Sequence, residues 1–271
     1  MAESFDGRQV LPIPHEKYQG LITYNAKDPS SSFPPIEPLR PPEGAPNVLV
    51  ILLDDVGFGA SSAFGGPCET PVAERLAGAG LKYNRFHTTA LCSPTRAALL
   101  TGRNHHAVGM AGITEIATAA PGYTSVIPNS CAALAETLKL NGYSTAQFGK
   151  CHEVPVWETS PMGPFRQWPT GQGFEHFYGF IGGETNQWAP AIYRDTVPIE
   201  PENGDDPDYH FGEDMTDHTI EWIRQQKALM GEKPFFIYYA PGATHAPHHV
   251  PAEWANKYRG QFDDGWDATR A

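Results

Sequence analysis

The chain has 271 residues, 40% of them hydrophobic, which is enough to bury a core as one large domain or two small ones; we expect one large domain. It carries 19 Lys and Arg against 31 Asp and Glu, a net charge of −12. This balance argues against nucleic acid or an anionic membrane as the main partner, because both require a basic stripe that the sequence lacks. A small anionic ligand is compatible with it if the few cations converge at one place.

The amino terminus and the cysteines predict the cellular compartment of the protein. The amino terminus lacks the basic and apolar regions of a signal peptide, and no apolar run is long enough to span a bilayer, so we expect a cytoplasmic protein. A trimmed leader or an upstream segment would instead place it in the periplasm or outside the cell. The four cysteines are too irregularly spaced for a disulfide framework, which favours a reduced compartment: Cys68, Cys92, Cys131 and Cys151.

The first elements in chain order are an arm and a strand. Residues 1–45 are rich in proline and serine and show no periodicity, which predicts an extended arm. Residues 47–53 form a continuous apolar run, typical of a strand that is covered on both faces. The run ends in Asp54 and Asp55, two adjacent carboxylates that require a compensating cation if they are buried. A solvated turn is the simpler interpretation of this pair taken alone.

The next segment predicts two helices with a strand between them. Thr70 and Pro71 begin a helix that Gly80 ends, and residues 81–86 resemble a strand. The second helix is expected to start at Pro94, with Ser93 as its N-cap, and to end at Gly102. Cys92 then lies just outside a helix N-terminus, where unpaired N–H groups stabilise an anion or a thiolate. A small buried hydrophobe is the alternative interpretation of this cysteine.

Helices and strands also alternate in the rest of the chain. A helix over residues 131–141 precedes a strand over 143–148, which delivers Lys150 and His152 at its carboxyl end. Residues 157–187 predict a long irregular excursion that could wall a pocket. A helix over 214–230 and a buried strand over 235–240 follow, and His245 comes directly after that strand.

Alternating strands and helices predict an α/β fold, with a mainly parallel sheet and helices on both faces. In such sheets ligands bind beyond the carboxyl ends of the strands, so the polar groups that follow three strands are expected to gather at one edge, together with Cys92 and Arg96. Carboxylates favour a hard divalent cation, whereas arginine, lysine and histidine favour an oxyanion. The combination indicates hydrolysis of a sulfate or phosphate ester.

The segment Cys-Ser-Pro-Thr-Arg-Ala-Ala-Leu-Leu-Thr-Gly-Arg at residues 92–103 resembles the signature of the type I sulfatases, whose cysteine is converted to formylglycine. Asp54 and Asp55 resemble the metal-binding acids of that family, Gly-Lys-Cys-His at 149–152 resembles its Gly-Lys-x-His element, and residues 244–248 resemble its later histidine segment. The resemblance implies the alkaline-phosphatase-like fold and a catalytic domain from residue 46 to 271.

The resemblance also implies a role for each matching residue. Cys92 would become formylglycine, whose hydrate attacks sulfur and ligates Ca²⁺, or Mg²⁺, together with Asp54 and Asp55. Arg96 would hold that hydrate and Lys150 would bind the sulfate. His152 would take the proton that expels sulfate, and His245 would bind substrate and assist the leaving alcohol or phenol. The partners implied are a small sulfate ester and a formylglycine-generating enzyme.

Two departures from the family pattern stand out. Cys151 occupies a position where family members usually have tryptophan, and the Asp-Asn metal pair and second sulfate-binding lysine of the family have no match before Ala271. The sequence therefore predicts the N-terminal part of a catalytic domain, incomplete at its C-terminus. The alternatives are a phosphodiesterase or phosphonate monoester hydrolase of the same superfamily, an inactive fragment and, less favoured, a thiol hydrolase that uses Cys92 with His152.

Overall fold

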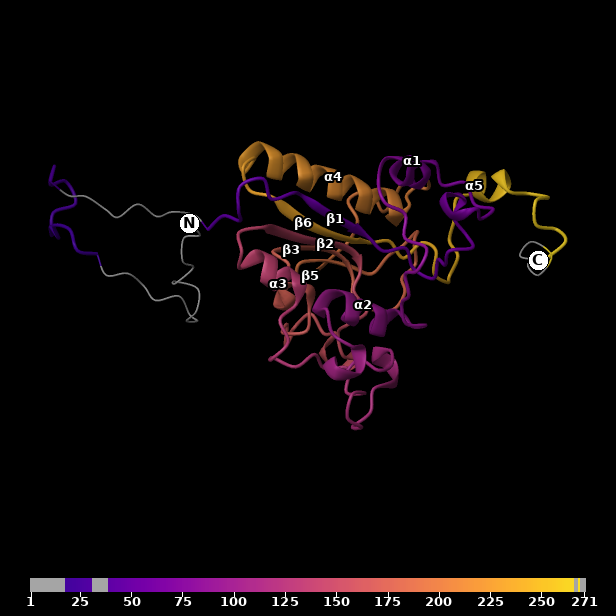
Figure 1. Cartoon of the computed structure of the whole chain (residues 1–271), viewed down its shortest axis with the longest axis horizontal. Helices are drawn as coiled ribbons and strands as arrows, with labels where there is room; N and C mark the ends of the chain where they lie inside the picture. The colour runs from indigo at the N-terminus through magenta and orange to yellow at the C-terminus, as the bar shows by residue number, and fades with distance from the viewer. Residues whose placement is uncertain (1–17, 31–38, 266–267, 269–271) are drawn as a thin grey trace. The chain divides into compact units, whose positions relative to one another are not determined.

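A six-stranded sheet is the framework of residues 40–271 (Figure 1). The computed structural model describes residues 18–30, 39–265 and 268. In spatial order the strands are β1 (Val48–Ile51), β6 (Phe235–Ala240), β2 (Ser144–Lys150), β3 (His176–Phe180), β4 (Ile192–Arg194) and β5 (Val197–Ile199). The first four strands pair in parallel, whereas the pairings of β3 with β4 and of β4 with β5 are antiparallel, so the predicted mainly parallel sheet is confirmed.

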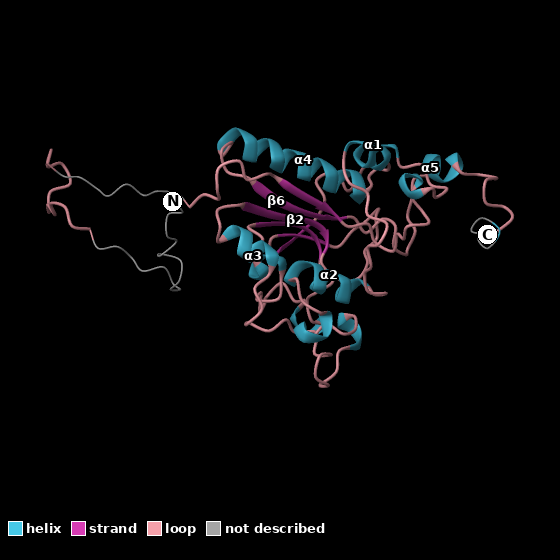
Figure 2. Ribbon diagram, in the orientation of Figure 1, coloured by secondary structure: helices cyan, strands magenta, loops and turns pink. Residues whose placement is uncertain are grey.

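Helices cover both faces of the sheet, as predicted (Figure 2). The helix α4 (Phe211–Leu229) lies on one face, and α2 (Cys92–Thr101) and α3 (Leu134–Lys139) lie on the other. Phe148 and Met215 share a core cluster on the α4 side, whereas Leu100 and Phe236 share one on the α2 side. Two further helices, α1 (Pro71–Ala79) and α5 (Ala252–Lys257), have no buried residue.

The prediction that the strand at residues 47–53 is covered on both faces is wrong. β1 stands at the end of the strand order, pairs only with β6 among the described strands, and alternates between half-buried and exposed side chains. Leu49 and Ile51 are each 51% exposed. An apolar run predicts a strand, but it does not say whether other elements cover both of its faces.

Other elements also differ from the prediction. No strand forms over residues 81–86, and the helix predicted over 131–141 is shortened to α3, with Ala133 at its N-cap. The predicted irregular excursion contains β3, which has Gly179 packed against the backbone of Gly149. Glycine is a poor strand former, so its presence concealed this strand in the sequence.

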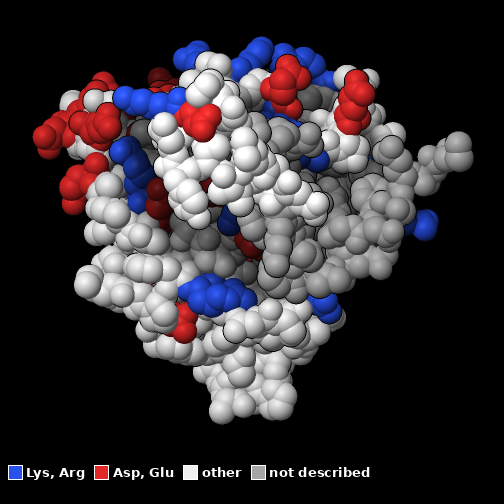
Figure 3. Space-filling view, turned by 90° about the vertical axis from the view of Figure 1, so that its left-hand side faces the viewer, with Lys and Arg blue, Asp and Glu red and all other residues white. Residues whose placement is uncertain are grey.

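Residues 1–39 form a separate unit, whose described residues 18–30 contain bends and turns. The arm predicted over residues 1–45 falls partly outside the described residues, and the domain boundaries stay a prediction. No described helix has the length and apolarity needed to cross a bilayer, and the cytoplasmic location stays a prediction too. On the face drawn in Figure 3, acidic side chains gather at the upper left, and basic and acidic side chains both occur along the upper part.

Candidate active site

The helix α2 places Cys92 beside the sheet edge. The helix starts at Cys92, two residues earlier than predicted, with Leu91 at its N-cap. Ser93 is therefore not the cap, and its Oγ is buried without a hydrogen-bond partner. Cys92 still lies in the first turn, whose backbone N–H groups have no intrahelical partner. The helix ends as predicted, with Gly102 in the left-handed conformation at φ 64°.

The end of β2 turns Lys150 and His152 into the site. Gly149 has φ 95°, and a Cβ there would collide with the carbonyl oxygen of Ala240 on the neighbouring strand. Only glycine is compatible with this close approach. His152 itself has φ 55°, and its N–H donates to the carbonyl of Ile181. All three side chains that follow Gly149 in the predicted motif are buried.

Asp54 is held by two buried cations. Lys150 Nζ lies 2.6 Å from Asp54 Oδ2, and Arg96 donates to Asp54 Oδ1 at 3.1 Å. Arg96 also donates to the carbonyl of Lys150 and to the hydroxyl of Tyr238. Burial alone would lower the pKa of Arg96, but the neighbouring Tyr238 and Asp54 outweigh burial, so the pKa is raised and the guanidinium stays charged.

A second chain of contacts runs from Cys92 through His152 to Glu115. Cys92 Sγ lies 3.0 Å from His152 Nδ1, and His152 Nε2 lies 2.9 Å and 3.0 Å from the two carboxylate oxygens of Glu115. Burial lowers the pKa of His152 despite the opposing effect of Glu115. Burial would raise the pKa of Glu115, but the hydrogen bond from His152 outweighs it and the pKa falls. The pair at neutral pH is thus a neutral imidazole and a carboxylate.

His245 lies on the side of the site that carries Asp55. Its Nε2 is 3.7 Å from Asp55 Oδ2, and its Nδ1 is 3.7 Å from Glu184 Oε2. The preceding Thr244 donates its hydroxyl to the carbonyl of Asp54, which ties the end of β6 to the end of β1. The side chain of Asp55 is 65% exposed and that of Asp54 only 4%, so the two adjacent acids have different environments.

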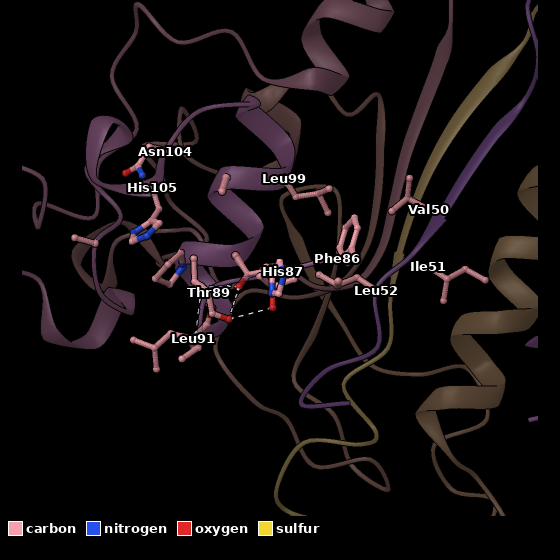
Figure 4. A pocket seen from close by; sticks show the side chains of 16 residues that line it. Val50, Ile51, Leu52, Phe86, His87, Thr89, Leu91, Leu99, Asn104 and His105 are labelled. Carbon is pink, nitrogen blue, oxygen red and sulfur yellow. Dashed lines mark hydrogen bonds between the residues drawn. The ribbon is translucent and has the colours of Figure 1, made fainter. Parts of the chain in front are cut away.

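Two hollows meet at this place. One, of about 270 Å³, is lined by Asp54, Asp55, Cys92 and Arg96 among others. The other, of about 790 Å³, is mainly apolar and lies between the end of β1 and one side of α2 (Figure 4). They share residues 88–91 as a common wall. The polar site therefore opens beside an apolar surface large enough for an organic group.

The donor set fits part of a coordination shell for a hard cation. Asp54 and Asp55 offer carboxylate oxygens, the ligands that Ca²⁺ and Mg²⁺ prefer. The two oxygens of Asp54 already face the cationic side chains of Arg96 and Lys150. In the described part of the chain, no three His, Cys, Asp or Glu side chains form a metal cluster. A cation with six or more ligands would need further donors.

The structure brings five of the predicted residues into direct contact: Asp54, Arg96 and Lys150 in one group, and Cys92 and His152 in the other. Among the acidic residues that the structure describes, His245 approaches only Asp55 and Glu184. Sequence reasoning missed Glu115 and Tyr238. Glu115 lies in a single helical turn far from any strand end, and Tyr238 reads as an apolar strand residue, so neither carries a local signal.

Glu153, next to His152, gives the first testable prediction. Burial raises its pKa from an ordinary value of 4.5 to about 8, and its Oε1 has no hydrogen-bond partner. Between these two pH values the folded chain keeps a proton that the unfolded chain has released. The free energy of unfolding therefore falls as the pH rises through this range. Glu153→Gln is expected to remove this decline, and urea unfolding at about pH 5 and about pH 8 checks it. Identical pH dependence in both proteins would contradict the prediction.

Comparisons with known proteins relate the chain to one family of hydrolases. The family model described as Sulfatase matches residues 46–271. An arylsulfatase of Klebsiella aerogenes is 31% identical over 231 residues, covering 82% of this chain and 47% of that protein. An uncharacterized sulfatase of Schizosaccharomyces pombe is 33% identical over 247 residues, with coverages of 83% and 42%. Rat N-acetylgalactosamine-6-sulfatase is 33% identical, with coverages of 81% and 43%.

Among solved structures, the crystal structure of Ps i-CgsB matches with a TM-score of 0.61 at 22% identity, covering 83% of this chain and 50% of that one. At this identity the likeness concerns the fold, and it confirms the alkaline-phosphatase-like architecture predicted from the sequence. The chain spans less than half the length of the curated relatives named above.

Proposed function

The chain belongs to the sulfatase family, and from this we propose that it carries the nucleophile side of a sulfuric ester hydrolase of the arylsulfatase type. The observation that supports this most directly is the contact of Cys92 with His152, at the end of the sheet where Arg96 and Lys150 stand around Asp54. The apolar hollow beside the site suits an ester whose alcohol part is an aryl or similar group.

Each residue has a separable task in this proposal. Formylglycine at position 92 would supply the attacking oxygen, and a Ca²⁺ or Mg²⁺ ion held by Asp54, Asp55 and residue 92 would neutralise charge on the sulfate. Arg96 and Lys150 add positive charge and hydrogen-bond donors for the sulfate oxygens. His152, neutral at physiological pH, accepts a proton from the side chain at position 92 through Nδ1. His245 binds the ester and protonates the leaving oxygen.

The modification requires a partner. Conversion of Cys92 to formylglycine replaces the thiol by an aldehyde with loss of sulfide, a two-electron oxidation that needs an external oxidant such as molecular oxygen. A formylglycine-generating enzyme is therefore the protein partner proposed, and a small sulfate ester is the substrate.

Turnover of matched esters tests the proposal. The chain is produced together with a formylglycine-generating enzyme, supplied with Ca²⁺ or Mg²⁺, and assayed with p-nitrophenyl sulfate and with a phenyl phosphonate monoester. Faster hydrolysis of the sulfate ester supports the sulfatase assignment. Preference for the phosphonate ester would contradict it, and absence of turnover by the converted chain would favour the inactive fragment.

A glycine beside His152 gives a further prediction. A Cβ at Gly183 would lie 2.8 Å from Cε1 and 3.0 Å from Nε2 of His152, so Gly183→Ala is expected to displace the imidazole from its position in the site. Because a displacement of about 1 Å at a reacting group costs about 100-fold in rate, we expect kcat to fall by about that factor. Gly182→Ala is the matched control, since its Cβ would meet only Glu184 O, at 3.8 Å. Equal kcat values for the two variants would contradict the prediction.

A further inference from the structure

The imidazole of His152 is held at both nitrogens by segments that are far apart in the sequence. Nδ1 faces Cys92 Sγ from α2, and Nε2 faces both carboxylate oxygens of Glu115 from the helical turn Thr114–Ile116. The ring is almost fully buried, whereas the side chain of Glu115 is 46% exposed. A half-exposed acid thus reaches into the site and contacts the one ring that also contacts Cys92.

We propose that Glu115 is a positioning residue, which holds His152 in the tautomer with hydrogen on Nε2 and leaves the Nδ1 lone pair facing position 92. An ionised carboxylate only accepts hydrogen bonds, so the nitrogen that faces it must carry the hydrogen. A neutral ring then has no hydrogen on Nδ1. This role rests on the proposed function, in which His152 accepts a proton through Nδ1.

The rest of the surroundings fixes where the ring lies but does not fix which nitrogen carries the hydrogen. The backbone N–H of His152 is bonded to Ile181, and Gly183 packs against the ring. Neither contact distinguishes the two tautomers. The sulfur of Cys92 is both a weak donor and a weak acceptor, so it also tolerates either. Glu115 is the strong, one-directional partner of this ring in the described part of the chain.

The turn that carries Glu115 is itself anchored. Thr114 is buried, and its hydroxyl donates to Glu115 Oε2 at 3.3 Å. The carboxylate is therefore oriented by its neighbour before it meets His152. Partners that orient a metal-ligating histidine through its second nitrogen typically contribute a factor of about 10 to 100 in activity, and we expect the same scale for His152.

Three substitutions separate the hydrogen-bonding role from size and charge. Glu115→Gln keeps the shape and one acceptor oxygen, Glu115→Ala removes the partner, and Glu115→Lys offers Nε2 only a donor. Asp195→Asn is the matched control, because Asp195 Oδ1 lies 3.6 Å from Nδ1 of a different histidine, His176. It removes the same charge from a histidine–carboxylate pair that the site does not use.

Ring nitrogen NMR of the unconverted 271-residue chain reads the tautomer without substrate or metal. We expect the Nε2–H form of His152 in the wild type, in Glu115→Gln and in Asp195→Asn, with the Nε2–H hydrogen-bonded to residue 115 in all three. Glu115→Ala is expected to lose that hydrogen bond, and Glu115→Lys is expected to convert the ring to the Nδ1–H form. Hydrogen on Nδ1 in the wild type, or an unchanged His152 spectrum in both Glu115→Ala and Glu115→Lys, would overturn the proposal.

Kinetics of the converted chain provide the second measurement. Glu115→Ala is expected to lower kcat by about 10- to 100-fold with KM changed by less than about threefold, and Glu115→Gln to restore part of the loss. An unchanged kcat in Glu115→Ala and Glu115→Lys would also overturn it. If the wild type hydrolyses no sulfate ester while the tautomer still follows residue 115, the proposed function fails and the positioning role stands.

Discussion

Cys92→Ala is expected to reduce kcat for p-nitrophenyl sulfate by more than about a thousandfold, the scale of loss seen when a nucleophile is removed. Cys92 occupies the first turn of α2 and contacts His152 at 3.0 Å, so it supplies the reacting side chain in the proposed function. Alanine keeps the helix, because it is a good helix former and the residue is only half-buried. The loss should therefore appear in turnover and not in the unfolding midpoint.

Cys68→Ala is the matched control for this experiment. Cys68 is also a free, half-buried cysteine, but its backbone lies in a bridge with Ser61 and it lines neither hollow of the site. Intact-protein mass spectrometry of the co-expressed chain should show a loss of about 18 Da, the exchange of H₂S for oxygen that converts the cysteine to an aldehyde nucleophile. Turnover retained in Cys92→Ala, or an unmodified Cys92 in fully active protein, would contradict the prediction.

Asp54→Asn is expected to lower the free energy of unfolding of the chain by about 3 to 5 kcal/mol, the cost of removing one partner from a buried ionic group. Asp54 is the only described carboxylate bonded to both Lys150 and Arg96, and all three side chains are buried. With a neutral amide at position 54, two cations would stay in the interior without a compensating charge. Urea unfolding of the two proteins at one pH measures the difference.

Asp55→Asn removes the same charge from the adjacent residue. The Asp55 side chain is 65% exposed and only 3.7 Å from a histidine, so the expected change is within about 1 kcal/mol. Equal destabilisation by the two substitutions would mean that the ion pairs of Asp54 do not govern stability. The same contacts imply that Lys150→Ala will affect stability as well as substrate binding, because Lys150 is fully buried against Asp54.

Much of the fold followed from local patterns. Apolar runs with helices between them predicted the parallel strands β2 and β6, and glycine and proline marked the bounds of α1 and the end of α2 correctly. The strand β3 and the two antiparallel strands were missed, because short strands that contain glycine and proline lack a strong pattern. The predicted start of α2 was two residues too late, because the helix is capped by Leu91, whose side chain makes no capping hydrogen bond and so carries no cap signal in the sequence.

The sequence by itself predicted which residues form the candidate site and that most of them follow strand ends. The rule that strand ends share one edge put Asp54, Lys150 and His245 together, and the run around Cys92 pointed to the family that the comparisons confirmed.

Only the tertiary structure decided which of these side chains touch. It paired Asp54 with both Arg96 and Lys150, and it brought Glu115 to His152. It also left one side of β1 without a strand neighbour among the described residues. Such contacts join residues 37 to 96 positions apart, so they depend on how the chain packs, and no local pattern of residues encodes that packing.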